Sequence, residues 1–348
     1  MDKGTLMKFI LLSLFTLFLF KSGTSQTLIP LQSGTNTSIR GLSVVTNSVA
    51  WISGSNGWTA HTSDMGKTWN WKQLAGYEKL DFRDIEAFSA KKALIVSAGS
   101  PAVILLTKDG GLNWKEVYRN NSPDIFLDGM DFWDNKRGII YGDPIKGRMQ
   151  LLKTKDGGLN WDDISNNVTI KLAEGEASFA ASGTAIRCRA GGKTWIATGG
   201  TQSRIFYSDD FGKTWDASPC PIIQGQNSTG PFSLAFSTDQ KGIVAGGDYL
   251  KDTLRTNNLL LTDDGGKTWI KPTTTSTIFG YRSAVEYISE KTVIATGTSG
   301  TDISYDGGKT WQSISSQGFN SVRKSKKGNW VLFTGSKGQI STLKLGTE

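Results

Sequence analysis

The sequence is poor in the residue types that most often build metal and catalytic sites. Its 348 residues include one histidine, two cysteines and eight prolines. The single histidine, His61, has no cluster of Cys, Asp or Glu at metal-ligand spacing around it. Neither a histidine-based metal site nor a Ser-His-Asp hydrolase is therefore indicated. We expect His61 to be a packed or half-exposed strand residue, and we expect no metal and no cofactor.

Long charged runs, low-complexity segments and linkers are also missing, so one large domain is expected. The formal charge of +8 is spread along the chain, and no nucleic-acid-binding module is visible. Nucleic acid is therefore not an expected ligand. The densest basic run, residues 323–327 (RKSKK), is interpreted as a solvated hairpin, with an anion-binding surface as the alternative.

Only one long apolar run is present, at residues 9–20, and its twelve residues are too few to span a membrane as a helix. Lys3 and Lys8 precede this run, and small residues follow it at positions 23–25. This is the pattern of a secretory signal peptide. We expect residues 1–25 to be cleaved and residues 26–348 to form one exported domain, periplasmic or secreted, with a formal charge of +6.

Glycine and tryptophan are abundant, and they belong to a repeat. An eight-residue cassette, T/S-x-D-x-G-x-T/N-W, occurs six times, and successive aspartates of the cassette lie 42 to 54 residues apart. That interval is the length of one four-stranded propeller blade. The cassette aspartates are Asp64, Asp109, Asp156, Asp210, Asp264 and Asp306.

A second element, a short β-branched or aromatic run that ends in glycine, occurs seven times, the last at Gly335. Seven blades are therefore expected. No cassette follows the seventh run, so another segment must complete that blade, and residues 27–31 (TLIPL) are the candidate. The predicted fold is all-β: a seven-bladed β-propeller of four-stranded antiparallel blades whose ring the N-terminal strand closes.

The chemistry of the cassette explains its recurrence. A tight turn needs glycine at positive φ, and short Asp, Ser or Thr side chains cap the free N–H groups of the turn. The tryptophan then covers the hairpin with a large apolar face. We therefore interpret the cassette carboxylates as structural and not as catalytic.

The cassette is identified as the Asp-box, or BNR repeat, found in sialidases, some glucanases, sortilin-like receptors and photosystem II stability/assembly factors. Its uninterrupted recurrence over residues 27–348 resembles most the photosystem II stability/assembly factor family and its bacterial relatives. The resemblance implies a non-enzymatic lumenal or periplasmic assembly factor with a protein or membrane-protein partner. The Asp-box itself specifies a fold and not a function.

Positions that break the repeat are the candidates for function. Aligning the entries to the seven inner strands places one residue per blade at the mouth of the central channel. Three arginines in this column come from blades six, one and two, which lie close together around the ring, and would suit a carboxylate, sulfate or phosphate. The column is Arg40, Arg83, Asp128, Ser178, Ser233, Arg282 and Asn320.

An acidic half is expected across the ring from the arginines. The longest repeats are the fourth and fifth, and their extra residues, which include 162–182 and 249–257, would build a wall over this half. The alternative is that the charges pair across the channel and merely close it. The residues expected here, with the tyrosines of the mouth, are Asp128, Asp143, Glu174, Glu176, Asp248, Tyr249 and Tyr281.

Two functional classes remain open. In the first, the chain is a monomeric binding scaffold whose mouth arginines hold an acidic segment or a chain end of a polypeptide. In the second, it is a glycosidase of sialidase-like Asp-box type acting on an acidic glycan. The Arg-Ile-Pro motif of sialidases is absent, since Ile39-Arg40-Gly41 occupies the nearest place. Catalytic residues of a glycosidase would come from Asp128, Glu174, Glu176 and Tyr281, or from Asp143 and Asp248.

The two cysteines, Cys188 and Cys220, both fall in the fourth repeat. An exported protein can form disulfides. Cys188 is expected in or beside the inner hairpin and Cys220 after the outer strand, and bonded Cα atoms must lie within about 7 Å, so the sequence leaves open whether the two cysteines are bonded.

Overall fold

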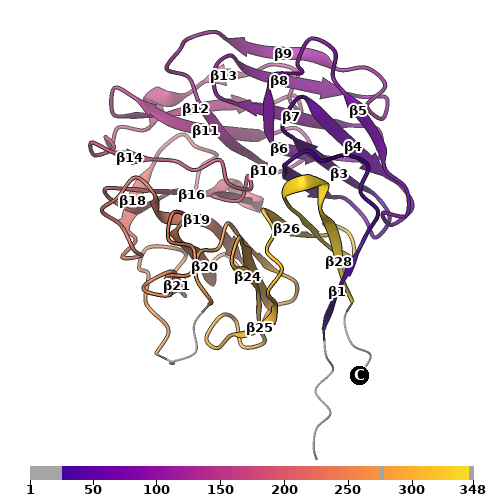
Figure 1. Ribbon diagram of the computed structural model, residues 1–348. Coiled ribbons are helices and arrows are strands. Elements are labelled where there is room, and N and C mark those ends of the chain that lie inside the picture. The colour runs from indigo at the N-terminus through magenta and orange to yellow at the C-terminus, as the bar shows by residue number, and fades with distance from the viewer. Residues whose placement is uncertain (1–25, 274–277, 345–348) are drawn as a thin grey trace, which may run out of the picture.

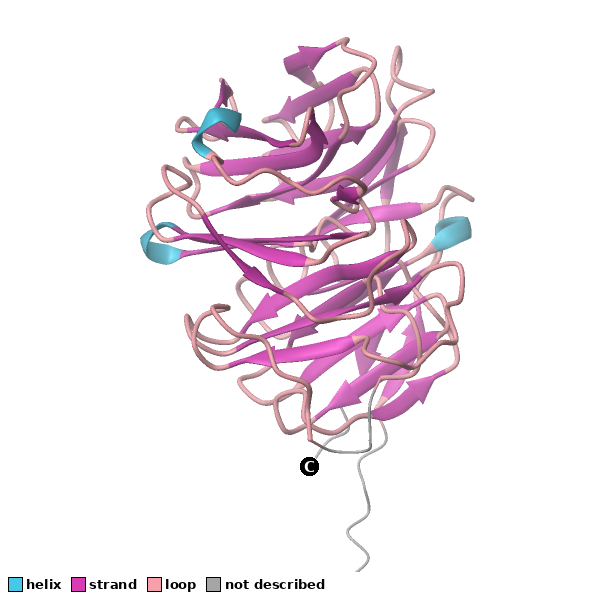
Figure 2. Ribbon diagram, turned by 90° about the vertical axis from the view of Figure 1, so that its left-hand side faces the viewer, coloured by secondary structure: helices cyan, strands magenta, loops and turns pink. Residues whose placement is uncertain are grey.

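The computed structural model describes residues 26–273 and 278–344, so the expected signal peptide lies outside the described residues. Strands form seven sheets that radiate around a central channel (Figure 1). Turned by 90°, the same sheets form a stack, and the three short 3-10 turns lie at its margins (Figure 2). The predicted seven-bladed all-β fold is confirmed. No helix among the described residues is long and apolar enough to cross a membrane.

The first three blades have four strands each, in the order of the chain. Their bounds are β2 (Ile39–Val44), β3 (Ala50–Gly54), β4 (Trp58–Thr62) and β5 (Asn70–Gln73); β6 (Asp81–Ala87), β7 (Ala93–Ala98), β8 (Ala102–Thr107) and β9 (Lys115–Asn120); and β10 (Leu127–Phe132), β11 (Gly138–Ile145), β12 (Arg148–Thr154) and β13 (Asp162–Asp163).

Blades four and five depart from the regular pattern. Blade four has a split inner strand, because β14 (Glu176–Ala177) and β15 (Ile186–Arg189) both pair with β16 (Lys193–Gly200), which is followed by β17 (Arg204–Ser208) and β18 (Asp216–Pro219). Blade five has β19 (Thr229–Phe236), β20 (Gly242–Asp248) and β21 (Leu259–Thr262), and a single bridge from Leu261 to Ile270 marks its outer position.

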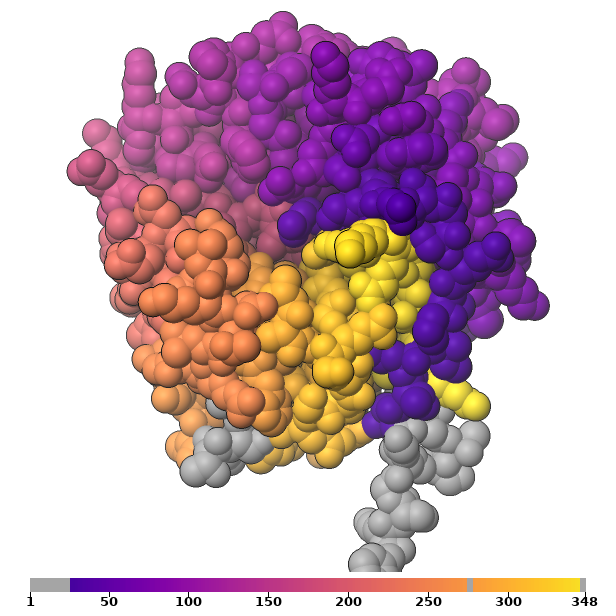
Figure 3. Space-filling model, viewed as in Figure 1, coloured from indigo at the N-terminus to yellow at the C-terminus, as the bar shows by residue number. Residues whose placement is uncertain are grey.

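The ring closes as the sequence predicted. Blade six contains β22 (Ala284–Tyr287), β23 (Val293–Gly297), β24 (Gly300–Ser304) and β25 (Gln312–Ser315), and blade seven contains β26 (Ser321–Lys324), β27 (Val331–Thr334), β28 (Ile340–Lys344) and β1 (Thr27–Pro30). Strand β1 pairs antiparallel with β28, from Thr27 opposite Lys344 to Pro30 opposite Ser341. In Figure 3 the indigo N-terminal segment lies directly against the yellow C-terminal blade.

Each cassette is a self-contained hydrogen-bonded turn. In the first, the Thr62 hydroxyl donates to Asp64 (2.8 Å), and the Gly66 N–H donates to the same hydroxyl (3.0 Å). Asp64 also accepts from the N–H of Thr68 (3.0 Å), and its hydrogen bonds, chiefly those from Thr68, lower the pKa of this carboxyl to about 2. The same N–H to carboxylate bond recurs at Asp109, Asp156, Asp210, Asp264 and Asp306.

Tryptophans outside the cassettes join neighbouring blades. The fully buried Trp51 donates from its indole nitrogen to the carbonyl of Ser89 in blade two (3.0 Å). Trp195 of blade four donates in the same way to Gly265 in blade five (2.7 Å). His61 stacks on Trp51 with the ring centroids 4.5 Å apart, so it is a packed strand residue. Both cysteines are free.

Candidate functional site

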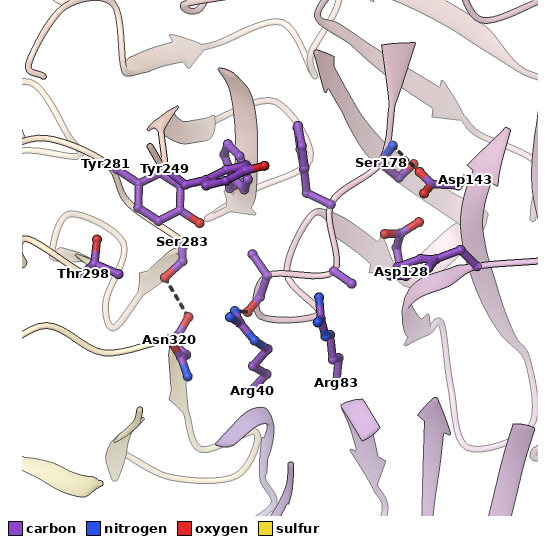
Figure 4. A pocket seen from close by; sticks show the side chains of 15 residues that line it. Arg40, Arg83, Asp128, Asp143, Ser178, Tyr249, Tyr281, Ser283, Thr298 and Asn320 are labelled. Carbon is purple, nitrogen blue, oxygen red and sulfur yellow. Dashed lines mark hydrogen bonds between the residues drawn. The ribbon is translucent and has the colours of Figure 1, made fainter. Parts of the chain in front are cut away.

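A pocket of about 400 Å³ opens at one mouth of the channel (Figure 4). Its walls come from the inner strands, from the loops before them, and from the ends of second strands, which supply Asp143, Tyr249 and Thr298. The lining residues are Arg40, Arg83, Phe126, Asp128, Asp143, Ser178, Phe179, Ala180, Ala181, Phe232, Tyr249, Tyr281, Ser283, Thr298 and Asn320.

β-Bulges turn four of these side chains toward the pocket. The pairing of β2 with β3 skips Arg40, and that of β6 with β7 skips Arg83. Asp128 is skipped in the same way between β10 and β11, and Phe232 between β19 and β20. A bulged residue is left out of the ladder and its side chain is re-aimed. Bulges therefore place the mouth residue in blades one, two, three and five.

The floor of the pocket is a segment that we call the channel plug, residues 178–185. It leaves blade four between β14 and β15 and crosses the channel. The plug carbonyl of Ala181 accepts from Arg40 (2.8 Å), and the plug hydroxyl of Ser182 donates to the carbonyl of Ser283 (2.7 Å). Contacts of the plug reach the six other blades, at Arg40, Asp84, Asp143, Ser233, Ser283 and Arg323. The pocket therefore has a closed floor, which Phe179, Ala180 and Ala181 form.

The basic side of the pocket is formed by Arg40 and Arg83. Arg40 is partly buried, and burial together with the charge of Arg83 lowers the pKa of its guanidinium. Arg83 forms an ion pair through Nε with Asp81 (2.7 Å), and its side chain remains one-third exposed. Figure 4 shows the two guanidinium groups next to each other at the pocket wall. Two adjacent planar donors suit a carboxylate or another oxyanion.

The acidic side is formed by Asp128 and Asp143. Asp128 is only 1% exposed, and neither of its carboxyl oxygens has a hydrogen-bond partner among the described residues. Asp143 accepts from the N–H of Ser178 (3.0 Å). Burial, and then the charge of Asp143, raises the pKa of Asp128 well above its usual range, and burial raises the pKa of Asp143 too.

The third side of the pocket is aromatic. Phe232 stacks on Phe179 of the plug at 4.0 Å and meets Tyr281 edge-on at 4.8 Å. Tyr281 is buried, which raises the pKa of its hydroxyl. Tyr249 and the adjacent Leu250 stand at the rim, 47% and 74% exposed.

Arg282 does not join the other two arginines. It is fully buried in blade six and forms an ion pair with Asp302 at 2.5 Å. The sequence alignment of the inner strands placed Arg282 at the mouth, but it is off by one residue in blade six. Ala284 pairs with Thr296, and the residue before it, Ser283, lines the pocket. Likewise Phe232, and not Ser233, is the bulged residue of blade five. Successive strand residues face opposite sides, so a shift of one residue exchanges a pocket position for an internal one.

Three of the expected acidic residues lie outside the pocket lining. Glu176 is buried and bonded to Arg204 at 2.6 Å, where it anchors the start of the plug. Glu174 is exposed. Asp248 is buried and accepts from the N–H of Leu250 (3.0 Å), which fixes the turn that presents Tyr249. Among residues 26–273 and 278–344, no group of three His, Cys, Asp or Glu could hold a metal ion.

The basic run 323–327 was expected to be a solvated hairpin, but two of its side chains are engaged. Arg323 is 18% exposed and lies 3.8 Å from the carboxylate of Glu286. Lys326 pairs with Glu86. These contacts join inner strands of different blades, so the run helps to hold the ring together.

Comparisons with known proteins agree with this architecture. Residues 24–124 match the family model of the photosynthesis system II assembly factor YCF48, and residues 206–217 match the BNR/Asp-box repeat. The chain is a BNR-repeat propeller that resembles YCF48. No curated protein matches the sequence.

Solved structures show the same fold. YCF48 bound to D1 peptide is 19% identical, with a TM-score of 0.65 over 93% of this chain and 97% of that one. YCF48 from Cyanidioschyzon merolae is 17% identical, with a TM-score of 0.63 over 91% and 98%. The GH74 enzyme of Niastella koreensis is 18% identical, with a TM-score of 0.62, but the match covers 90% of this chain and only 53% of the enzyme. At these identities the likeness concerns the fold alone.

Proposed function

We propose that this protein is an exported, non-enzymatic binding propeller that holds a polypeptide partner by a carboxylate at the mouth pocket. The observation that carries the proposal is the pair Arg40 and Arg83, side by side at the wall of a pocket with a closed floor. A guanidinium bonded to a carboxylate contributes about 1.5–3 kcal/mol per charge-assisted hydrogen bond. Two such groups would be sufficient to bind one oxyanion tightly.

The shape of the site favours a chain end or a single acidic side chain of the partner. A pocket of about 400 Å³ has room for one or two residues, and the channel plug blocks passage of a chain through the ring. Tyr249 and Leu250 at the rim offer an exposed apolar contact beside the pocket. The resemblance to YCF48, one structure of which is bound to D1 peptide, supports a protein or membrane-protein partner in assembly.

The test is affinity capture from a cell envelope with tagged residues 26–348. Wild-type protein is compared with the double variant Arg40→Ala/Arg83→Ala and with the charge-matched control Arg119→Ala/Arg137→Ala, whose side chains lie in exposed pairs with Glu116 and Asp134. We expect a polypeptide that wild type and control retain and the pocket variant loses. Equal retention by all three proteins would refute the pocket as the binding site.

A glycosidase is the second candidate, because Asp128 and Asp143 are two carboxyl groups that line one pocket. Glycoside hydrolysis uses such a pair, one of the two with a raised pKa. The assay is release of reducing sugar from acidic and neutral glycans by wild type, Asp128→Asn and Asp143→Asn. Activity that both variants lose would favour the enzyme over the scaffold.

A further inference from the structure

Asp128 is a buried carboxyl group that the protein itself does not satisfy. Its side chain lines the pocket at 1% exposure, and both oxygens are without a partner among the described residues. The nearby N–H of Asp143 donates elsewhere, to the carbonyl of Phe126 (2.9 Å). A buried polar group without hydrogen bonds is costly, so native proteins rarely keep one without a reason. Its position in the wall of an open pocket points to a ligand group that completes it.

The surroundings of Asp128 indicate what that ligand group is. A second carboxyl group, that of Asp143, lines the same side of the pocket. The charge of Arg83 acts on Asp128, but the Nε of Arg83 is bonded to Asp81 (2.7 Å). Burial raises the pKa of both carboxyl groups, so neither ionises readily without a cation beside it. A compact cationic donor in the pocket would stabilise the ionised form of Asp128 and supply its missing hydrogen bonds.

In Figure 4 the carboxyl groups of Asp128 and Asp143 lie on one side of the cavity, and the guanidinium groups of Arg40 and Arg83 lie on another. We infer that the pocket takes a dipolar ligand, whose carboxylate contacts Arg40 and Arg83 and whose ammonium group contacts Asp128. This inference rests on the proposed function for the arginine contact and adds the requirement for a cation. Asp128 is then the residue that determines specificity, because only a ligand with a cationic donor completes its hydrogen bonds as a carboxylate.

The aromatic side supplies the rest of the ligand environment. Phe232 and Tyr281 pack edge-on, and Phe179 of the plug stacks on Phe232, so an apolar group placed between the two charged sides meets rings. Two sources share this chemistry. One is a free amino acid with an apolar side chain, and the other is a polypeptide segment in which an acidic and a basic side chain lie close together.

The experiment is titration calorimetry of mature protein, residues 26–348, with L-phenylalanine and with N-acetyl-L-phenylalanine, which keeps the carboxylate and the ring but lacks the ammonium group. We expect the acetylated probe to bind at least about tenfold more weakly, the loss typical of one charge-assisted hydrogen bond. Asp128→Asn should lower the affinity for phenylalanine to the level of the acetylated probe. Asp124→Asn, the same change at an exposed residue of blade three outside the pocket lining, should leave both affinities unchanged.

A second arm separates the two sources. Peptides with both ends blocked, Glu-Phe-Lys and Glu-Phe-Gln, present the same carboxylate with and without a cation. The site is assigned to a polypeptide if wild type prefers the lysine peptide, Asp128→Asn loses this preference, and free phenylalanine does not bind. Preference for free phenylalanine alone assigns it to a small molecule.

The inference is overturned if neither ammonium-bearing probe is preferred over its partner, or if Asp128→Asn keeps the wild-type preference. Thermal denaturation of the Asp128→Asn variant is the control for folding. The proposed function fails separately, when envelope capture does not depend on Arg40 and Arg83. If envelope capture depends on Arg40 and Arg83 but the ammonium group does not change the affinity of the probes, the proposed function is supported and the inference of a dipolar ligand is wrong.

Discussion

At the residue scale, two groups of aspartates have opposite electrostatics: those of the cassettes, and Asp84 and Asp128 at the channel. The cassette aspartates are stabilised as anions, since hydrogen bonds lower the pKa of Asp64 and Asp109 to about 2. The channel aspartates are destabilised as anions, since burial raises the pKa of Asp84 to about 7. The ionised carboxylate is thus stabilised in the cassette turn and disfavoured in the channel, where it is buried.

A cassette aspartate should matter for stability and not for binding. Asp264 accepts from the Thr262 hydroxyl (2.8 Å) and from the N–H of Thr268 (3.0 Å). Asp264→Ala leaves these donors unsatisfied, so we expect a loss of about 1–2 kcal/mol in the free energy of unfolding. Its exposed neighbour Asp263 is the matched control, and Asp263→Ala should cost less than about 0.5 kcal/mol in urea denaturation. Equal losses would contradict the structural role.

Asp84 should make the protein less stable as the pH rises. Burial is the main cause of its raised pKa, which the charge of Glu86 raises further, while Arg323 and two backbone N–H groups lower it. A carboxyl whose folded pKa exceeds its unfolded value favours the folded state below about pH 4, and this contribution is lost as the pH rises through about 7.

The corresponding measurement is urea unfolding of wild type and Asp84→Asn from pH 4 to pH 8. The wild-type free energy of unfolding should fall across this range by up to about 4 kcal/mol more than that of the variant. A variant with an unchanged slope would show that Asp84 remains ionised throughout.

At the element scale, the bulge and the plug are the devices that make the pocket. The repeat predicts where each inner strand starts, and it brings Arg40, Arg83 and Asp128 to the mouth. It does not show which residue is bulged, because a bulge depends on the hydrogen-bond register of two strands. Arg282 was therefore aligned with the mouth although it is paired inside blade six with Asp302.

The plug was visible in the sequence only as extra length. Residues 162–182 were expected to build a wall over the acidic half, whereas residues 178–185 pass through the channel. Long-range contacts fix this path, such as the bond between Thr184 and Ser233 (2.6 Å), and no local pattern encodes them. Phe179, which the plug brings into the pocket, could not be recognised for the same reason.

Gly183 is the tightest point of the plug. Its φ is +67°, and a Cβ there would lie 2.2 Å from the carboxyl carbon of Asp84. Gly183→Ala should therefore lower the free energy of unfolding by more than about 2 kcal/mol. Gly76→Ala is the control, because Gly76 has a φ of +85° but open space around it, and backbone strain alone should cost about 1 kcal/mol. Similar losses of stability in both variants would mean that the plug shifts to accommodate the added methyl group without further cost.

At the scale of the whole molecule, two segments are expected to decide whether the chain is exported and whether its ring is stable. One is the N-terminal leader, residues 1–25, whose export role is a prediction from sequence. When the full chain is expressed in a bacterium, the periplasmic product should begin at Gln26 by N-terminal sequencing. Leu14→Arg, which interrupts the apolar run, should leave the chain uncleaved in the cytoplasm. An uncleaved wild-type product would refute the signal peptide.

The other segment is β1, which closes the ring by pairing with β28. Leu28 packs partly buried against the core cluster of blades six and seven, whereas its neighbour Ile29 is 41% exposed. A charge at Leu28 should detach β1 and expose the edge of β28, which can then pair with another chain. Leu28→Asp is therefore expected to lower the free energy of unfolding by about 2–4 kcal/mol and the melting temperature by several degrees. It should also produce dimers or aggregates in size-exclusion chromatography.

Ile29→Asp places the same charge on the solvent side of the same strand, so it should elute like wild type, with a melting temperature close to wild type. If the two variants behave alike, β1 is dispensable, and the other six blades together with β26, β27 and β28 hold the ring closed by themselves.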